Sequence, residues 1–446
     1  MIDARRHLER YLSDQALDIP DADELTPPRD ELEACVVIPA YDELEDLPDV
    51  IRSLEQASTT PEIFEVIVVV NNASDAPDDK VRANQQTIEF LRSGITTAFD
   101  LHVLDRSSPS KAYAPDVAGV GRARREGCDL ALQRLQAVGR EREGVLPNLD
   151  GDSPVAPRYV DNIIAEFREQ PEMLAGVCRY RHPIPDNSEH AEAIVTYETW
   201  MRYFAAALTW TESPYAFQSI GSCMALSARG YALADGMPQL EALSDFYMLQ
   251  KIAKVGGFGA VRQLTRPFVH PSARPSPRVP RGTGPSVTDR MDGGGDKFDF
   301  VEPPAAFRQL RALFRAVRDG YERPDVLRDV GAGGLLGEFL EDQDGWETIE
   351  KLRENTPSAE HFEVQFHTWF DSLKIVKFAN VTRRELGGAW IMDALPVVLE
   401  GIELAVLAED IPAVSPEDAT LEQRRAVLEL LRTHEMALAH HPRIGD

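Results

Sequence analysis

The chain of 446 residues is long enough for about two or three domains, and its 43% of hydrophobic residues can build a sizeable core. Asp and Glu (74) outnumber Lys and Arg (47), and the formal charge of −27 argues against nucleic acid and anionic membrane surfaces as general partners. Lysine is scarce, which together with the acidity suggests adaptation to high salt, with an acidic mesophilic protein as the alternative.

The cysteines and the N-terminus bear on the compartment. Four cysteines are widely spaced in apolar surroundings, so neither a zinc site nor a disulfide framework is indicated. The first residues are too polar for a signal peptide, and no apolar run approaches the roughly 20 residues of a membrane span. We therefore expect a soluble cytoplasmic protein without a transmembrane segment, and the sequence leaves open whether identical copies form a homo-oligomer.

Buried strands alternate with amphipathic helices over the first two thirds of the chain. Continuous apolar runs predict strands at 34–39, 64–70, 100–104, just before Asp150, at 175–180 and at 219–226. Helical spacing is found at 46–57, 81–93, 122–135, 159–167, 191–210 and 243–255. This alternation is typical of an α/β domain with a parallel sheet, in which ligands bind at the carboxyl ends of the strands.

The last third of the chain has a different pattern. Helical periods are found at 305–318, 360–380, 388–407 and 420–440, with no clear strands, and the glycines of 289–297 mark a hinge before them. We predict an N-terminal helical appendage and linker at 1–30, an α/β catalytic domain at 31–288 and an all-helical region at 300–446.

Asp150 and Asp152 stand at the end of an apolar run, in the sequence NLDGDSP. In a strand, alternate side chains point to the same face, so both carboxylates could reach one divalent cation. Mg2+ and Mn2+ prefer oxygen ligands and keep positions open for the phosphates of a nucleotide. The alternative is an ordinary solvated turn, because Asp-Gly-Asp is common in turns.

The segment 270–284 is rich in proline and arginine, which is unusual in so acidic a chain. Guanidinium groups chelate phosphate oxygens in pairs, so Arg274, Arg278 and Arg281 are candidates for binding a diphosphate. We expect this loop to be mobile when empty and to close over the diphosphate. A solvated basic loop is the alternative.

Six motifs in order resemble the family-2 glycosyltransferases, which are nucleotide-sugar enzymes of the GT-A fold. They cover roughly residues 34 to 285. They are VVIPAYDE (36–43), VVVNNASD (68–75), GVGRARREGCDLAL (119–132), NLDGDSPVAP (148–157), GSCMALSARGYALADG (221–236) and LSDFYMLQKIAKVGG (243–257). The segment PSARPSPRVPRGTG is similar to a tail in a bacterial subgroup of the family. The resemblance implies a GT-A fold, which is Rossmann-like, with a mostly parallel central sheet and flanking helices; it does not extend to the C-terminal helical region.

The resemblance also implies roles for individual residues. Asp150 and Asp152 match the carboxylates that hold the metal and the sugar nucleotide, and His270 matches a loop histidine that serves as a further metal ligand in some relatives. Asp245 matches the base of inverting members, for which a helix cap is the alternative. The residues expected to line the nucleoside pocket and contact the base are Pro39, Tyr41, Glu43, Asn72 and Asp75.

Three places depart from the family pattern. Ser244 stands where the family commonly has Glu, and Arg125 stands where many members have Asn. The family also more often has an Asp near Asn71 or Asn72, which leaves the choice of nucleotide base open.

The predicted function is therefore the metal-dependent transfer of a sugar, as by a hexosyltransferase, from a nucleotide-diphosphate donor to an acceptor hydroxyl. Mg2+ or Mn2+ would neutralise the leaving group, and Asp245 would take the acceptor's proton, with inversion at the sugar. One alternative is a retaining synthase of a small charged glycoside that serves as an osmolyte. Another is a non-catalytic nucleotide-sugar-binding protein of the same fold. A nucleotidyltransferase is disfavoured because no Gly-rich, basic signature follows the first strand. The sequence indicates neither the donor sugar nor the acceptor.

Overall fold

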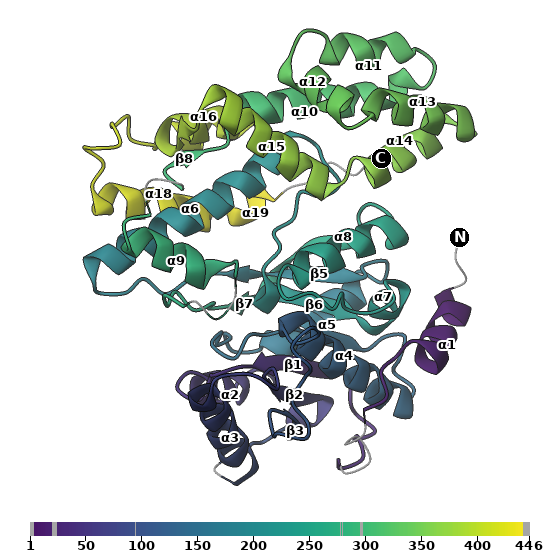
Figure 1. Cartoon of the computed structure of the whole chain (residues 1–446), viewed down its shortest axis with the longest axis vertical. Coiled ribbons are helices and arrows are strands. Elements are labelled where there is room, and N and C mark those ends of the chain that lie inside the picture. Colours follow the sequence, from purple (N-terminus) through teal and green to yellow (C-terminus); the bar gives the residue numbers. More distant parts are fainter. Residues whose placement is uncertain are drawn as a thin grey trace. The chain divides into compact units, whose positions relative to one another are not determined.

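The computed structural model describes residues 4–19, 25–93, 95–276, 278, 280–294 and 298–439 (Figure 1). The chain forms two compact units, Met1–Pro183 with Ser219–Pro285 and Ile184–Gln218 with Ser286–Asp446. Several residues of the predicted segments lie outside the described residues. These are 1–3 and 20–24 of the expected appendage, 277 and 279 of the arginine-rich loop, 295–297 of the expected hinge and 440 at the end of the last expected helix.

Within its described residues, the first unit is built on a seven-stranded sheet of order β3-β2-β1-β4-β6-β5-β7, in which only β6 runs antiparallel to its neighbours. The expected α/β class with a mostly parallel sheet is confirmed. The strands are β1 (Ala34–Ala40), β2 (Phe64–Asn71), β3 (Asp100–Arg106), β4 (Val145–Pro147), β5 (Ala175–Tyr180), β6 (Met224–Ser227) and β7 (Val261–Val269).

Helices connect and cover these strands, and α4 packs on β1 and β2. A helix that leads into a parallel strand runs back across the sheet, so α4 and α8 begin at the edge where the parallel strands end. The helices of this unit are α1 (Ala4–Asp14), α2 (Leu47–Leu54), α3 (Asp78–Ser93), α4 (Val120–Ala137), α5 (Tyr159–Glu169), α7 (Ala228–Leu233) and α8 (Ser244–Gly256), with short 3-10 turns η2 (Pro61–Ile63) and η3 (Gly221–Cys223).

Two strands differ from the sequence prediction. Within the run expected as a strand at 219–226, residues 221–223 form η3, and only residues 224–226 enter β6. Strand β7 has no counterpart in the prediction, because it lies at the edge of the sheet and several of its side chains are exposed or half-buried. Its Pro267 is tolerated because an edge strand does not need every N–H for the ladder.

The expected N-terminal appendage is part of the first unit. Helix α1 packs on α7, and the hydroxyl of the fully buried Tyr11 donates to Asp129 Oδ1 at 2.5 Å. Asp129 also accepts from the Tyr231 hydroxyl at 2.7 Å and from Arg125 Nε at 2.8 Å. A buried carboxylate with this many donors stabilises the attachment of α1.

The second unit is helical, as expected for the C-terminal region, and also includes the long helix α6 (Ser188–Trp210), which the sequence-based division assigned to the α/β domain. Helix α6 packs on α10, α16 and α18. The other helices are α9 (Thr283–Met291), whose first residues up to Pro285 are assigned to the first unit, α10 (Pro304–Gly320), α11 (Pro324–Gly331), α12 (Leu335–Asp342), α13 (Gly345–Asn355), α14 (Ala359–Trp369), α15 (Ser372–Leu386), α16 (Ile391–Gly401), α17 (Ala405–Ala408), α18 (Leu421–Thr433) and α19 (Glu435–Leu438).

A correction concerns the expectation of no strands beyond residue 300. Strands β8 (Phe300–Val301) and β9 (Ala389–Trp390) pair antiparallel, and two residues per strand are too short to give a sequence signal. None of the described helices combines the length and the apolarity that crossing a bilayer requires.

Buried ion pairs fix α6 within the second unit. Glu198, which is fully buried, accepts from Arg202 Nε at 2.9 Å and from Arg432 Nε of α18 at 2.8 Å. Arg202 also donates to Glu435 of α19 at 3.1 Å. Because each of these buried charges has a partner, the network holds α6, α18 and α19 together.

The attachment of α1 can be tested with Tyr11→Phe, which removes one donor from a buried carboxylate. We expect a loss of about 1–3 kcal/mol in the free energy of unfolding of the first unit, measured by urea titration. Ser13→Ala, on the exposed side of the same helix, is the control and should change the free energy by less than about 0.5 kcal/mol. Equal midpoints for the two variants would contradict a role for α1 in stability.

Candidate active site at the carboxyl edge of the sheet

The parallel strands deliver most of the predicted site residues to one edge of the sheet. Strand β1 ends just before Tyr41, β2 ends at Asn71, and the short β4 ends just before the turn that carries Asp150 and Asp152. Strand β7 runs parallel to β5 and so ends at the same edge, where it leads into the arginine-rich loop. Four segments far apart in the sequence therefore meet here.

The turn after β4 is fixed on both sides. Leu149 N donates to Val37 O of β1 at 3.0 Å, and further on Ala156 N donates to Phe268 O of β7 at 3.0 Å. The tail of the turn thus runs beside the end of β7 and ties the carboxylates to the base of the arginine-rich loop.

Gly151 allows the turn to approach Glu43. A Cβ at position 151 would lie 2.8 Å from Glu43 Cγ and 3.2 Å from Glu43 Cβ, which is closer than side chains normally pack. A glycine between Asp150 and Asp152 therefore brings a third carboxylate, from the β1 turn, next to the pair that the sequence indicated.

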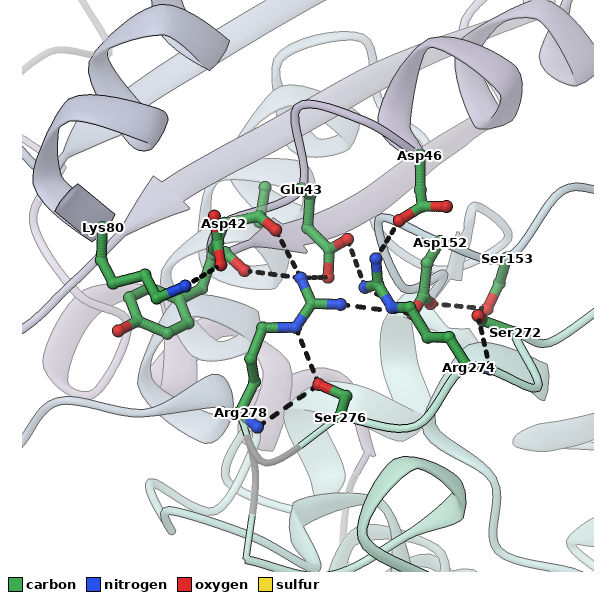
Figure 2. Close-up of polar contacts among 12 residues, drawn as sticks. Asp42, Glu43, Asp46, Lys80, Asp152, Ser153, Ser272, Arg274, Ser276 and Arg278 are labelled. Atoms are coloured by element: carbon green, nitrogen blue, oxygen red, sulfur yellow. Dashed lines mark hydrogen bonds and ion pairs between the residues drawn. The ribbon is translucent and has the colours of Figure 1, made fainter. Parts of the chain in front are cut away.

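Arg274 compensates three carboxylates (Figure 2). Its Nη2 lies 2.5 Å from Glu43 Oε2 and 2.7 Å from Asp152 Oδ2, and its Nη1 pairs with Asp46 at the start of α2. The side chain of Glu43 is 11% exposed and that of Asp152 is 18% exposed. Charges this deeply placed need partners, and Arg274 joins the turns after β1 and β4 by supplying one.

Arg278 lies beside Arg274 and makes a second set of contacts in the same cluster. Its Nη1 is 2.9 Å from Glu43 Oε1 and 3.1 Å from the carbonyl oxygen of Tyr41, and its Nη2 is 3.9 Å from Asp152 Oδ2. Its Nε donates to Ser276 Oγ at 3.0 Å. The arginine-rich loop is therefore docked on the carboxylates in this structure, by two guanidinium groups.

Burial governs the charge state of these carboxylates. It raises the pKa of Glu43, where the charge of Asp152 adds to the effect, and it raises the pKa of Asp152, where Asp150 adds to it. Arg278 lowers the pKa of both. Burial and crowding outweigh Arg278, so the pKa of Glu43 is raised to about 9 and that of Asp152 to about 6.

The turns after β1 and β2 are joined by a buried amide. Asn84 of α3, which is fully buried, accepts from Asp42 N at 2.9 Å and donates to Asn71 O at 3.0 Å and to Asn72 Oδ1 at 2.9 Å. Lys80 of the same helix donates to Asp42 Oδ2 at 2.5 Å. Helix α3 therefore fixes the shape of the predicted nucleoside pocket.

Asp245 lies in the first turn of α8 and is half-buried. Burial raises the pKa of its carboxyl group, and Arg124 opposes this shift. Leu243 directly before this helix has φ 64°, a left-handed conformation that costs a leucine energy. The backbone that presents Asp245 is therefore held in place by its surroundings.

Arg124 links Asp150 to the start of α8. It is 4% exposed, donates from Nη2 to Asp150 Oδ1 at 2.5 Å, and donates from Nη1 to Ser244 Oγ at 3.2 Å. Sequence reasoning missed this residue, together with Asn84, Asp46 and Lys80. The motif GRARREG contained Arg124, but nothing in the sequence alone distinguishes it from the neighbouring arginines.

The other predicted residues are placed as follows. Pro39 is buried in β1, Asp75 and Arg281 are exposed, and His270 is exposed with its ring 5.1 Å from that of Phe268. Among the described residues no group of three or more His, Cys, Asp and Glu side chains is arranged to hold a metal ion. Any cation at Asp150 and Asp152 would therefore need oxygen ligands from water or substrate.

No protein-family model matches the chain, and no curated protein matches it. Among solved structures, the mannosyltransferase PcManGT from Pyrobaculum calidifontis in complex with GDP-Man and Mn2+ gives a TM-score of 0.35 with 14% identity over 97% of this chain and 93% of that chain. S. aureus TarS 1–349 gives 0.34 with 14% identity over 91% and 90%, and its complex with UDP-GlcNAc gives 0.33 with 14% identity over 91% of each chain. At TM-scores this low the likenesses carry no functional argument.

The docking of the loop predicts different effects for two of its arginines. Arg274→Met leaves three carboxylates less compensated, and should lower the free energy of unfolding at pH 7 by about 1–3 kcal/mol. The deficit should shrink between pH 7 and about pH 5, because burial raises the pKa of Asp152 to about 6 and its carboxyl group takes up a proton in this window. The exposed Arg281→Met is the matched control, with an expected change below about 0.5 kcal/mol. Urea titrations at both pH values measure this, and equal effects of the two variants at pH 7 would contradict the assignment.

Proposed function

We propose that this protein is a glycosyltransferase of the GT-A type, which transfers a sugar from a nucleotide diphosphate to an acceptor hydroxyl. The observation that carries the proposal is the convergence of Asp152, Glu43, Arg274 and Arg278 at the carboxyl edge of a parallel sheet, where such folds bind nucleotides. The motifs that resemble family-2 glycosyltransferases also support it, because two of them contain the turns that carry Glu43 and Asp152.

The donor is proposed to lie along this edge. Its nucleoside would lie near Pro39, Tyr41, Asn72 and Asp75. Asn84 holds the turns of this region together through its hydrogen bonds to Asp42 N and Asn72 Oδ1. Its diphosphate would lie next to Arg274 and Arg278, since paired guanidinium groups match phosphate oxygens. To reach phosphate, these arginines must exchange some of their contacts with Glu43, Asp46 and Asp152. Glu43 is therefore better explained as a partner of the arginines than as a ribose ligand.

Mg2+ or Mn2+ is proposed as the cofactor, held by Asp150 and Asp152. Each carboxylate has an oxygen that no arginine engages: Asp150 Oδ2 has no protein partner among the described residues, and Asp152 Oδ1 accepts only from Ser153 Oγ at 3.3 Å. Such a pair fits a hard cation that takes its remaining ligands from the diphosphate and water. When bound, the cation would supply charge neutralisation for the leaving diphosphate. His270 is proposed as a ligand on the resemblance alone.

Asp245 is proposed as the general base. In the transfer, the acceptor oxygen forms a bond to the anomeric carbon while the bond from that carbon to the diphosphate oxygen breaks. The proton of the acceptor hydroxyl passes to the Asp245 carboxylate, and the nucleoside diphosphate leaves with the electron pair. Because the acceptor oxygen attacks the anomeric carbon from the face opposite the leaving group, the transfer gives inversion.

Metal dependence is tested by nucleotide binding. Calorimetric titration with UDP and with GDP, each with Mn2+, Mg2+ or EDTA, should show binding that requires the cation and falls about tenfold or more in Asp152→Asn. Asp49→Asn, at an exposed carboxylate of α2, is the control and should bind as wild type. Equal affinity in Mn2+ and in EDTA would overturn the metal assignment. The diphosphate would then be bound by the arginines without a cation.

The base is tested by separating binding from turnover. Asp245→Asn should bind nucleotide diphosphate as tightly as wild type but lose about a hundredfold or more in kcat. Near-normal turnover, or loss of the folded state in a urea titration, would make Asp245 a structural residue. The anomeric configuration of the product, determined by NMR, separates inverting transfer from the retaining osmolyte synthase. Nucleotide-sugar binding without any transfer or hydrolysis would favour the non-catalytic alternative.

A further inference from the structure

The side chain of Arg124 is buried beside a glycine. It lies in the second turn of α4, and Gly221 at the start of η3 faces its guanidinium group. A Cβ at position 221 would lie 2.1 Å from Nη2 and 2.7 Å from Cζ, so any other residue would displace the group. The guanidinium group is thus packed against Gly221, in a residue that is 4% exposed.

The partners of Arg124 come from the two sides of the proposed reaction. Nη2 donates to Asp150, which follows β4 and belongs to the donor side. Nη1 donates to Ser244, which is fully buried and directly precedes Asp245 on the acceptor side. Because the guanidinium is planar and rigid, the two hydrogen bonds fix the Asp150 turn relative to the start of α8.

The neighbouring Arg125 shows what a purely structural pair looks like in this helix. Its carboxylate partner Asp129 is fully buried and also accepts from Tyr11, Tyr231 and the backbone N–H of Leu17. The side chain of Asp150, in contrast, is 37% exposed and keeps Oδ2 available. The ion pair with Arg124 therefore orients the Asp150 carboxylate through Oδ1 and leaves Oδ2 available to a ligand.

On these grounds, and resting on the proposed function, we infer that Arg124 is a positioning residue that sets the donor-side carboxylate Asp150 and the acceptor-side base Asp245 at a fixed separation. It touches neither substrate in this scheme. Ser244, which stands where related enzymes commonly have an acidic residue, is the acceptor-side end of this bridge. Loss of the bond to Asp150 should therefore weaken nucleotide binding, whereas loss of the bond to Ser244 should mainly lower kcat.

Arg124→Lys keeps the positive charge but cannot donate from a planar fork to both partners. We expect kcat/KM to fall about tenfold or more, and the affinity for UDP or GDP with Mn2+ to fall severalfold, because one charged hydrogen bond contributes on the order of tenfold. Ser244→Ala removes only the acceptor-side bond. It should leave nucleotide affinity within about twofold of wild type and lower kcat by roughly threefold to tenfold.

Arg125→Lys is the matched control. It alters a buried arginine one residue away, which contacts Tyr11 of α1 and the backbone oxygen of Gln15. It should lower the urea midpoint and leave kcat and nucleotide affinity close to wild type. Values of kcat and nucleotide affinity for Arg124→Lys within about twofold of wild type would overturn the inference while the proposed function stands. The same would follow if Ser244→Ala weakened nucleotide binding as much as Arg124→Lys. If wild type binds neither UDP nor GDP with Mn2+, the proposed function fails, and the positioning role fails with it.

Discussion

The compensation of buried carboxylates by arginine is the interaction on which this site depends. The turns after β1 and β4 bring Glu43 and Asp152 together, where burial and neighbouring carboxylates raise the pKa of both groups and Arg278 lowers it only in part. Arg274, from a loop more than two hundred residues further along the chain, forms ion pairs with both groups. The parallel arrangement of β1, β4 and β7 is what makes the three segments meet.

The same compensation defines what a ligand must do. Arg274 and Arg278 pair with Glu43, Asp46 and Asp152, so a diphosphate that recruits the arginines would take this positive charge from the carboxylates unless something else supplies it. A divalent cation arriving with the diphosphate would do so, since it adds positive charge where the guanidinium groups withdraw. In the proposed function, metal and nucleotide therefore bind as a pair.

Sequence patterns predicted the parts of this structure that depend on local chemistry. The apolar runs of β1 and β2 and the turns that follow them gave the sheet edge, and the resemblance placed Asp150, Asp152 and Asp245 on it. Long-range pairing could not be predicted. Nothing local indicates that Arg274 pairs with Glu43, that Asn84 joins two turns, or that α6 packs with the C-terminal helices. Strand β7 was missed because an edge strand lacks the continuous apolar run of a buried one.

Two adjacent residues of α4 illustrate why some contacts could not be predicted from the sequence. Successive side chains of a helix point about 100° apart, so Arg124 and Arg125 face different neighbours. The sequence alone does not distinguish the partners of the two arginines. Arg124 reaches Asp150 and Ser244, whereas Arg125 lies 5.3 Å from the ring of Tyr11 and holds the N-terminal helix. Arg125 also donates from Nη2 to the backbone oxygen of Gln15, directly after α1. Where the sequence departs from the pattern of the family that it resembles, Arg125 therefore contacts the N-terminal segment and not the carboxylates of the candidate site.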